Sequence, residues 1–375
     1  MKQEVLVGSI HLTTLVSFLR NKEIQRVLLV TGKNSFSDSS ASTVLEPYLS
    51  DFEVSRFCEF SRNPKIEDVL EGIQVFQRED CQVIIAVGGG SVLDMAKLIK
   101  AYEDSSVEIS NQISHNEVGV CQPPLIVLPT TAGSGSEATQ FAVVYIDNKK
   151  YSVSSELLRP NLVFLIPELT LSATPYLTAT TGMDALTQAI ESFWSINSTE
   201  TSREYSREAL GNIWKYLPLA VHENDSRAKS ELMHAAHLAG KAINVAKTTA
   251  AHAISYSFTT YHGIPHGHAV ALTIGFFCSY NSQITDMDSN DARGASHVRA
   301  IFSEIHEILG EDDLEKALNS FISGIGLDLF IPQGPEGVEY DIAKILANIN
   351  AQRMKNNPRF VREDDLKLML KKLFI

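Results

Sequence analysis

The stretch IIAVGGGSVLDMAK, residues 84–97, decides the fold. A continuous apolar run that ends at glycine is typical of a strand covered on both faces of a sheet. The three glycines come next, and a serine follows at the start of a predicted helix. Glycine allows a backbone to approach a phosphate closely, and a helix N-terminus presents unpaired N–H groups. The stretch predicts a phosphate-binding turn, with a plain tight turn as the alternative when this loop is taken alone.

Two further apolar runs flank this stretch in the sequence. Residues 27–30 (VLLV) are followed by TGKNSF, and residues 125–128 (LIVL) by PTTAGSGSEAT at 129–139. Helical stretches between such runs indicate a parallel sheet, so we predict a doubly wound α/β domain. Loops at the carboxyl ends of its strands meet where open α/β sheets bind ligands. The two small-residue loops together favour a nucleotide site.

The second half of the chain has a different pattern. Strand signals stop after about residue 175, and long helix-compatible stretches cover residues 202–214, 226–246, 298–309 and 364–374. The segment PELTLSATP at 167–175 contains two prolines and is the predicted boundary. We therefore expect an α/β domain over residues 1–175 and an all-helical domain over residues 176–375.

Histidines gather in one segment of the helical half. AHAISYSFTTYHGIPHGHAVAL, residues 251–272, holds four of the eleven histidines, and such density favours a metal or proton-transfer site over single structural histidines. Upstream, TGMDALTQAIESFWS places Asp184 and Gln188 on one face of an apolar helix. Asp184, His252 and His266 would supply three ligands to a catalytic cation. A surface or capping aspartate is the alternative for Asp184.

Composition excludes several functions. The 375 residues carry a net charge of −13, a poor match to a phosphate backbone, so we expect no nucleic-acid partner. No apolar run approaches the roughly 18 to 20 residues that span a bilayer, and the charged N-terminus does not resemble a signal peptide. We expect a cytoplasmic protein without a membrane partner.

Five motifs, in order, resemble the iron-containing (group III) alcohol dehydrogenases. They are GGGSVLDMAK, LPTTAGSGSEAT, GMDALTQAIESF, the HAISY segment and PHGHAVAL, and the resemblance extends to NPR at 357–359. It implies an α/β dinucleotide-binding domain, a helical metal-binding domain and a homodimer. The dehydroquinate synthases share this architecture, but their richer set of basic substrate residues is not evident here.

The resemblance implies four metal-ligand positions, which here hold Asp184, Gln188, His252 and His266. Family members carry histidine where this chain has Gln188, and a glutamine amide is a poorer ligand than imidazole. Related glycerol dehydrogenases use one carboxylate and two histidines around zinc. We therefore expect a divalent cation that is either iron or zinc. Where the family tends to carry a proton-transfer histidine, this chain has Tyr256. We expect Tyr256 or His262 in the proton relay, with His268 as a further substitute.

The resemblance also places residues along a nicotinamide dinucleotide. At Gly32, members that prefer NAD carry an aspartate that binds the adenosine ribose. Without that carboxylate a 2′-phosphate is not repelled, and Lys33 or Ser35 is available to contact it, so we expect NADPH rather than NADH. The remaining cofactor positions are Asn63, Gly88, Gly89, Gly90, Ser91, Thr130, Thr131, Ser134, Thr139, Lys150 and Leu177.

Within the family, the segments around residues 184–199 and 250–273 look most like the phosphonoacetaldehyde reductases. The resemblance implies reduction of phosphonoacetaldehyde to 2-hydroxyethylphosphonate. Lys241 and Lys247 are candidate holders of the phosphonate, with solvated helix lysines as the alternative. A general alcohol or glycerol dehydrogenase, and a non-catalytic NADP-binding relative, are the competing hypotheses.

Overall fold

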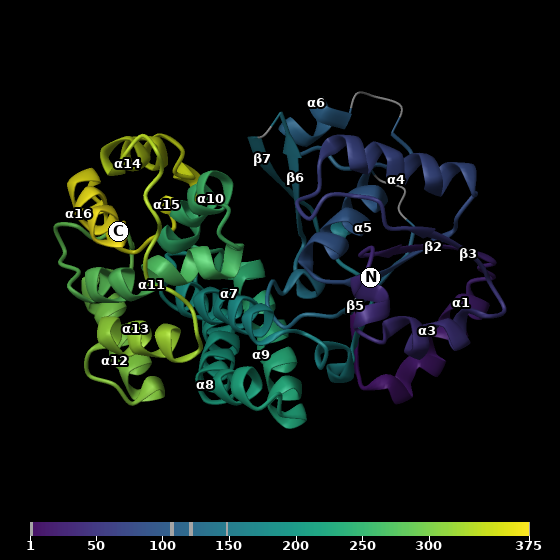
Figure 1. Ribbon diagram of the computed structural model, residues 1–375, viewed down its shortest axis with the longest axis horizontal. Helices are drawn as coiled ribbons and strands as arrows, with labels where there is room; N and C mark the ends of the chain where they lie inside the picture. Colours follow the sequence, from purple (N-terminus) through teal and green to yellow (C-terminus); the bar gives the residue numbers. More distant parts are fainter. Residues whose placement is uncertain (1–2, 106–108, 120–122, 148, 375) are drawn as a thin grey trace. The chain divides into compact units, whose positions relative to one another are not determined.

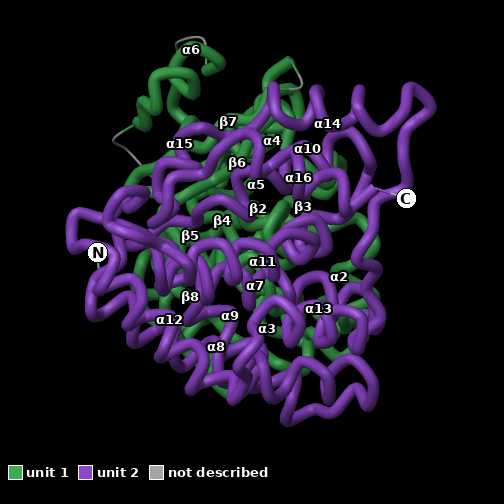
Figure 2. The backbone as a smooth tube through the Cα atoms, turned by 90° about the vertical axis from the view of Figure 1, so that its left-hand side faces the viewer, with its two compact units in different colours: residues 1–173 green, residues 174–375 purple. Residues whose placement is uncertain are grey.

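The computed structural model describes residues 3–105, 109–119, 123–147 and 149–374. The chain forms two compact units, residues 1–173 and 174–375 (Figure 2). The division falls within the 167–175 segment that the sequence marks as the boundary. Each unit has its own architecture and is described separately below.

A six-stranded sheet forms the centre of the first unit, and every neighbouring pair of strands is parallel. This confirms the predicted α/β fold. The inner strands are apolar and almost completely buried, whereas the two edge strands expose most of their residues. In spatial order the strands are β1 (Glu4–Val7), β8 (Leu162–Leu165), β5 (Leu125–Pro129), β4 (Val83–Gly88), β2 (Arg26–Thr31) and β3 (Glu53–Phe57).

Helices cover both faces of this sheet (Figure 1). Leu15 of α1 (Leu12–Asn21) and Leu45 of α3 (Ala41–Leu49) belong to one buried cluster with the side chains that alternate toward them from β2 and β4. The pleat turns the intervening strand residues to the opposite face, where α5 (Gly90–Tyr102) packs beside α4 (Ile66–Arg78). The strands are therefore buried on both sides, which explains their continuous apolar runs. The short helices α2 (Ser35–Asp38) and α6 (Ile109–Ser114) complete this unit.

An antiparallel hairpin that the sequence analysis did not predict also belongs to the first unit. It joins β6 (Phe141–Ile146) to β7 (Lys149–Ser154). In β6 only Ala142 and Val144 are buried, and in β7 only Val153 is, so no continuous buried run marks the hairpin. The hairpin follows directly after the second small-residue loop.

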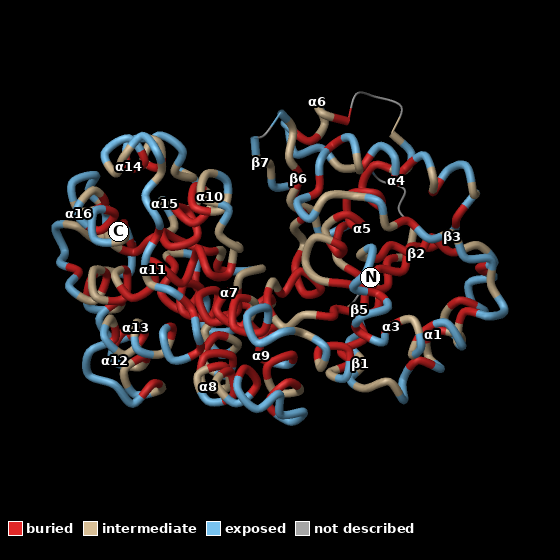
Figure 3. The backbone as a smooth tube through the Cα atoms, viewed as in Figure 1, coloured by how far each residue is buried: buried red, intermediate tan, exposed pale blue. Residues whose placement is uncertain are grey.

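The second unit is helical, as predicted. Helices α8, α9 and α11 pack around α7, whose residues are buried along most of its length (Figure 3). The predicted segments 202–214, 226–246, 298–309 and 364–374 fall in α8, α9, α12 and α16. The helices are α7 (Pro175–Trp194), α8 (Glu200–His222), α9 (Ser226–Ala246), α10 (Ala250–His262), α11 (His266–Ser282), α12 (Ala295–Leu309), α13 (Leu314–Gly324), α14 (Val338–Ala347), α15 (Ala351–Met354) and α16 (Glu363–Leu373).

Among the described residues, none of the helices combines the length and the apolar character that a membrane span requires.

Candidate metal centre and cofactor loops

Three side chains from three helices converge in the second unit. Asp184 lies on α7, His252 near the start of α10 and His266 at the first position of α11. Asp184 Oδ1 is 3.3 Å from His252 Nε2 and 3.9 Å from His266 Nε2, and one ligand atom from each residue lies within 4.8 Å of the others. Two ligands about 2.1 Å from one cation lie roughly 3.4 Å apart, so this set of one carboxylate and two imidazoles fits a divalent metal such as zinc or iron.

A glycine brings His266 close to Asp184. A Cβ atom at Gly267 would collide with the backbone carbonyl of Thr180, so only glycine allows the first turn of α11 to approach α7 this closely. The Pro-His-Gly turn in the sequence therefore has a packing role as well as a ligand role.

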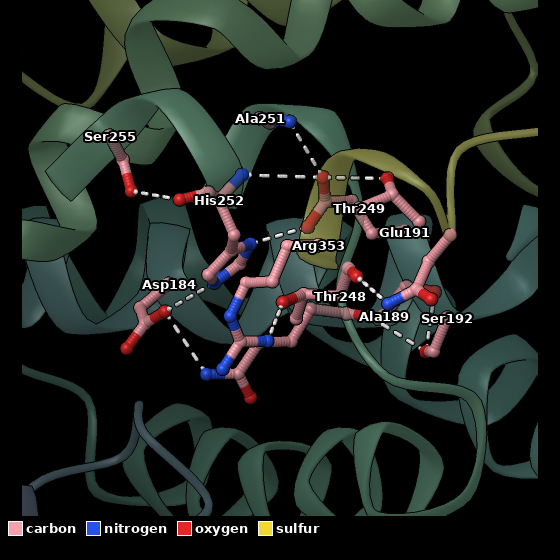
Figure 4. A network of polar contacts seen from close by, with 12 residues as sticks. Asp184, Ala189, Glu191, Ser192, Thr248, Thr249, Ala251, His252, Ser255 and Arg353 are labelled. Carbon is pink, nitrogen blue, oxygen red and sulfur yellow. Dashed lines mark hydrogen bonds and ion pairs between the residues drawn. The ribbon is translucent and has the colours of Figure 1, made fainter. Parts of the chain in front are cut away.

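Glu191 orients the imidazole ring of His252, and the sequence did not lead us to predict this role. Its carboxylate accepts a hydrogen bond from His252 Nδ1, and it also accepts from the Thr249 hydroxyl and the Ala251 amide, both at 2.8 Å (Figure 4). An imidazole held at Nδ1 presents Nε2 to a metal, which is the usual arrangement of a carboxylate behind a ligating histidine. The available signal was spacing, because Glu191 lies seven residues after Asp184 on the same helical face.

The buried charges at the centre stabilise one another. Burial alone would raise the pKa of Asp184, but the hydrogen bond with His252 and the charge of His266 hold it below its usual range. Burial likewise opposes ionisation of Glu191, yet the interactions with His252 keep its pKa below the ordinary value. Two carboxylates that stay ionised in a buried site provide the negative charge that a divalent cation neutralises.

Gln188 lies beside these ligands. It is buried one turn after Asp184, and its amide nitrogen donates a hydrogen bond of 3.0 Å to Asp184 Oδ1. The fourth ligand position that the family resemblance implies therefore adjoins the converging group. A carboxamide oxygen is a weaker ligand than imidazole, so three residues form the core of the site.

The candidate proton-transfer residues lie in different surroundings. His268 contacts the Tyr176 hydroxyl at 3.3 Å and the Asp328 carbonyl at 2.7 Å. Tyr256 stacks on His266, with ring centroids 5.5 Å apart and an angle of 6° between the ring planes. His262 is the last residue of α10, about 15 Å along the helix from His252 at 1.5 Å per residue, and its ring contacts Phe374. The structure thus brings Tyr256, but not His262, to the ligand group.

The glycine loop of the first unit joins β4 to α5. Gly88 ends the strand, and the backbone at Gly89 begins the helix, with Ser91 in its first turn. A Cβ atom at Gly90 would lie 2.7 Å from the hydroxyl oxygen of Ser134, and one at Gly89 would lie 3.3 Å from that of Thr131. The two small-residue loops therefore lie side by side at the ends of adjacent strands, as predicted.

A buried lysine anchors the second loop. The Lys97 ammonium group, on α5, donates to the backbone carbonyls of Ser136 (2.6 Å), Thr139 (2.9 Å) and Phe141 (2.8 Å). Burial lowers the pKa of Lys97 to about 8, and the nearby carboxylate of Asp94 opposes that change. Thr139, a predicted cofactor residue, is therefore fixed through its carbonyl to α5.

An arginine that the sequence analysis did not select adjoins the loop after β2. Arg56 donates to the Thr31 hydroxyl at 2.8 Å and to the carbonyls of Gly32 (3.2 Å) and Lys33 (3.1 Å). Lys33 itself pairs with Glu59 at 2.9 Å. The cations near Gly32 are thus Arg56, which comes from the adjacent strand, and Lys33.

The other predicted cofactor residues occupy separate places. Thr130 follows β5, and its amide donates to the Gly88 carbonyl at 3.1 Å. Asn63 is exposed in the segment before α4, and Lys150 belongs to β7. Leu177 lies in the first turn of α7, in the second unit, and is 41% exposed.

The candidate substrate lysines have contacts within their own region. The Lys241 ammonium lies 3.8 Å from the centroid of the Tyr205 ring, which is a cation–π contact with α8. Lys247 caps α9 and donates to the Asn244 carbonyl at 3.3 Å. Neither lysine belongs to the converging metal-ligand group formed by the described residues.

The fold and the site together fit a metal-dependent dehydrogenase, with two small-residue loops in the α/β unit and a group of one carboxylate and two imidazoles in the helical unit. The sequence matches the family model "Iron-containing alcohol dehydrogenase" over residues 2–167 and "Fe-containing alcohol dehydrogenase family, C-terminal" over residues 178–374. The chain belongs to the iron-containing alcohol dehydrogenase family. It is accordingly an oxidoreductase that acts on CH–OH groups with a nicotinamide dinucleotide and a divalent metal.

Individual relatives act on short substrates. A phosphonoacetaldehyde reductase of Streptomyces viridochromogenes is 32% identical over 77% of this chain and 75% of its own length. A 1-propanol dehydrogenase of Salmonella typhimurium is 30% identical over 86% of both chains. Among solved structures, a sulfoacetaldehyde reductase from Bifidobacterium kashiwanohense in complex with NAD+ superposes with a TM-score of 0.87 at 29% identity, over 99% of this chain and 96% of that one.

Proposed function

We propose that this protein reduces phosphonoacetaldehyde to 2-hydroxyethylphosphonate with NADPH. The observation that carries the reductase chemistry is the convergence of Asp184, His252 and His266, with Glu191 behind His252. The substrate class is supported by two relatives whose substrates are acetaldehydes with an anionic group on the second carbon. In the reaction the carbonyl carbon gains a hydride and the carbonyl oxygen gains a proton.

The residues of the helical unit divide this work. Asp184, His252 and His266 would hold the cation, with Gln188 beside them as the fourth position. When bound, the cation polarises the carbonyl group and the nicotinamide supplies the hydride. Tyr256 is the proposed proton donor rather than His262, because Tyr256 stacks on His266 whereas His262 packs against Phe374.

The loop geometry of the α/β unit supports the proposed cofactor residues. The pyrophosphate is assigned to the Gly88–Gly90 turn and Ser91, at the N-terminus of α5. The NADPH preference is assigned to the absence of a carboxylate at Gly32 together with the nearby Arg56 and Lys33, because an arginine near the ribose accommodates a 2′-phosphate. Thr130, Thr131, Ser134, Thr139, Asn63, Lys150 and Leu177 are the remaining proposed contacts.

The test is NADPH oxidation by metal-analysed protein that is offered phosphonoacetaldehyde or propanal, with zinc or ferrous iron added. We expect kcat/KM to be at least about 100-fold higher for the phosphonate, the size of one well-formed charged contact. Equal use of propanal would favour a general short-chain alcohol dehydrogenase, a second candidate supported by the likeness to 1-propanol dehydrogenase. Absence of turnover with either metal would favour a non-catalytic dinucleotide-binding protein.

A further inference from the structure

Arg353 is the cation that the structure brings to the metal centre. It comes from α15, about eighty residues after the end of the histidine segment, and no sequence motif marks it. Its guanidinium carbon lies 5.8 Å from the centroid of the Tyr256 ring, and Tyr256 in turn stacks on His266. Its Nη1 donates to the Thr248 hydroxyl, and Figure 4 shows the side chain directed into the same region as Asp184 and His252. Arg353 thus adjoins the ring that covers a metal ligand.

The backbone around Arg353 fixes it in this place. Its own amide donates to the Asn350 side chain at 3.0 Å, and the Asn350 amide donates to the Ala253 carbonyl of α10 at 3.2 Å. Thr248, which receives the guanidinium, precedes the Thr249 that bonds Glu191. Thr248 and Thr249, which are neighbours in the chain, therefore position Arg353 and Glu191 respectively.

The charge of Arg353 is not neutralised by a neighbouring carboxylate. Throughout the part of the chain that the structure describes, no ion pair joins Arg353 to an acidic residue, and the side chain is partly accessible. A guanidinium has five N–H donors in a planar fork, so donors remain after the bonds to Thr248 and Tyr256. By contrast, four other arginines of this unit pair with carboxylates: Arg203, Arg207, Arg293 and Arg359.

We propose that Arg353 binds the anionic end of the substrate, a tetrahedral phosphonate or sulfonate on the carbon next to the aldehyde. This inference rests on the proposed function and replaces Lys241 and Lys247 as the principal anion partner. A planar guanidinium forms two parallel hydrogen bonds to such an oxoanion, which an ammonium group does not. With the aldehyde oxygen directed to the cation held by Asp184, His252 and His266, Arg353 selects substrates that carry a negative charge at the other end.

The test compares Arg353→Met with the wild type on phosphonoacetaldehyde, sulfoacetaldehyde and propanal. Methionine keeps much of the length and removes the charge. We expect kcat/KM for both anionic aldehydes to fall about 100-fold further than the value for propanal, which reports any effect of the substitution on Tyr256. Arg227→Met, which removes an exposed charge from the start of α9, serves as the matched control.

A binding measurement supplies a readout that is independent of turnover. In calorimetric titration of the metal-loaded protein with 2-hydroxyethylphosphonate, Arg353→Met should weaken binding to a similar degree while the bound metal per chain stays unchanged. Arg353→Lys should recover part of the affinity, because it restores the charge but not the fork. This second variant also serves if Arg353→Met does not fold.

The outcomes separate this inference from the proposed function. Suppose that the wild type prefers the anionic aldehydes and that Arg353→Met keeps this preference. The assignment of Arg353 is then wrong, and the reductase proposal stands. Lys241→Met and Lys247→Met would next be measured to find the residue that binds the anionic group. If Arg353→Met slows propanal equally, Arg353 supports the metal centre rather than the anion, and the inference fails. If the wild type does not discriminate against propanal, the proposed substrate is wrong, and the inference falls with it.

Discussion

Glu191 holds His252 through Nδ1 of the imidazole, so Nε2 is the ring nitrogen that faces Asp184. We expect Glu191→Gln to weaken metal binding by about 10- to 100-fold, because an amide of the same shape is a poorer acceptor and leaves the ring less firmly oriented. Competition with a chelator measures this. Glu204→Gln, on the exposed face of α8, is the control, and equal affinities for the two variants would show that Glu191 is not needed.

Asp184→Ala should remove bound metal and abolish aldehyde reduction while NADPH binding stays nearly unchanged. The reason is that the only carboxylate in the ligand group formed by the described residues would be lost, whereas the glycine loop belongs to the other unit. Metal analysis and a fluorescence titration with NADPH measure the two properties. Asp312→Ala removes an exposed carboxylate for comparison. Full metal content in Asp184→Ala would take Asp184 out of the site.

Gln188→His should tighten metal binding, by about tenfold or more. An imidazole one turn after Asp184 would add a fourth nitrogen ligand where a carboxamide now lies. Chelator competition with zinc and with ferrous iron measures the gain, and Gln188→Leu is the matched variant without a ligand atom. If histidine and leucine give the same affinity, residue 188 does not face the cation.

Gly32→Asp should shift cofactor preference from NADPH toward NADH by about tenfold, because a carboxylate there would accept from a ribose hydroxyl and repel a 2′-phosphate. The new side chain would collide with the Ser35 hydroxyl, which must rotate away. The substitution is therefore also made together with Ser35→Ala, which removes that collision. The ratio of kcat/KM for the two cofactors is the measurement. An unaltered ratio in both Gly32→Asp and the double variant with Ser35→Ala would show that residue 32 does not contact the adenosine ribose.

Asp288→Asn should lower the free energy of unfolding by about 1–2 kcal/mol at pH 7, with a smaller loss in acid. Burial opposes ionisation of Asp288, but the hydrogen bonds from Thr285 and the 2.8 Å ion pair with Arg359 hold its pKa below the ordinary value. A lowered pKa stabilises the fold above about pH 4, and the contribution disappears as pH falls toward the folded-state pKa.

Urea denaturation at pH 7 and in steps below pH 4 tests this dependence, with Asp312→Asn as the control. The two variants should converge in acid. A deficit for Asp288→Asn that is constant with pH would mean that the substitution acts through packing.

The sequence predicts the inner strands better than the rest of the α/β unit. A run such as residues 84–87 is continuous and apolar because β4 is covered on both faces. β3, at the sheet edge, exposes most of EVSRF, and so its sequence lacks that signal. The hairpin of β6 and β7 lacks the signal for a related reason, since only three of its strand residues, Ala142, Val144 and Val153, are buried.

At the candidate site, local spacing was informative and distant contacts were not. Asp184 and the histidine segment stand out because polar residues interrupt apolar helices. Glu191 is adjacent to that pattern and could have been found by extending the helical face by one turn. Arg353 could not, because only the packing of α15 on α10 brings it to Tyr256, and no local pattern encodes that contact.

The buried Lys97 fixes the second small-residue loop before any dinucleotide binds. Its ammonium group already gathers three carbonyls of the segment 136–141, so this loop loses its conformational freedom when the chain folds and not when the dinucleotide arrives. The association reaction is spared that entropic cost. The carbonyl dipoles are also turned toward an internal cation. In the proposed dinucleotide site, this segment is therefore already ordered, and exchange of oxidised for reduced cofactor would need no refolding of it.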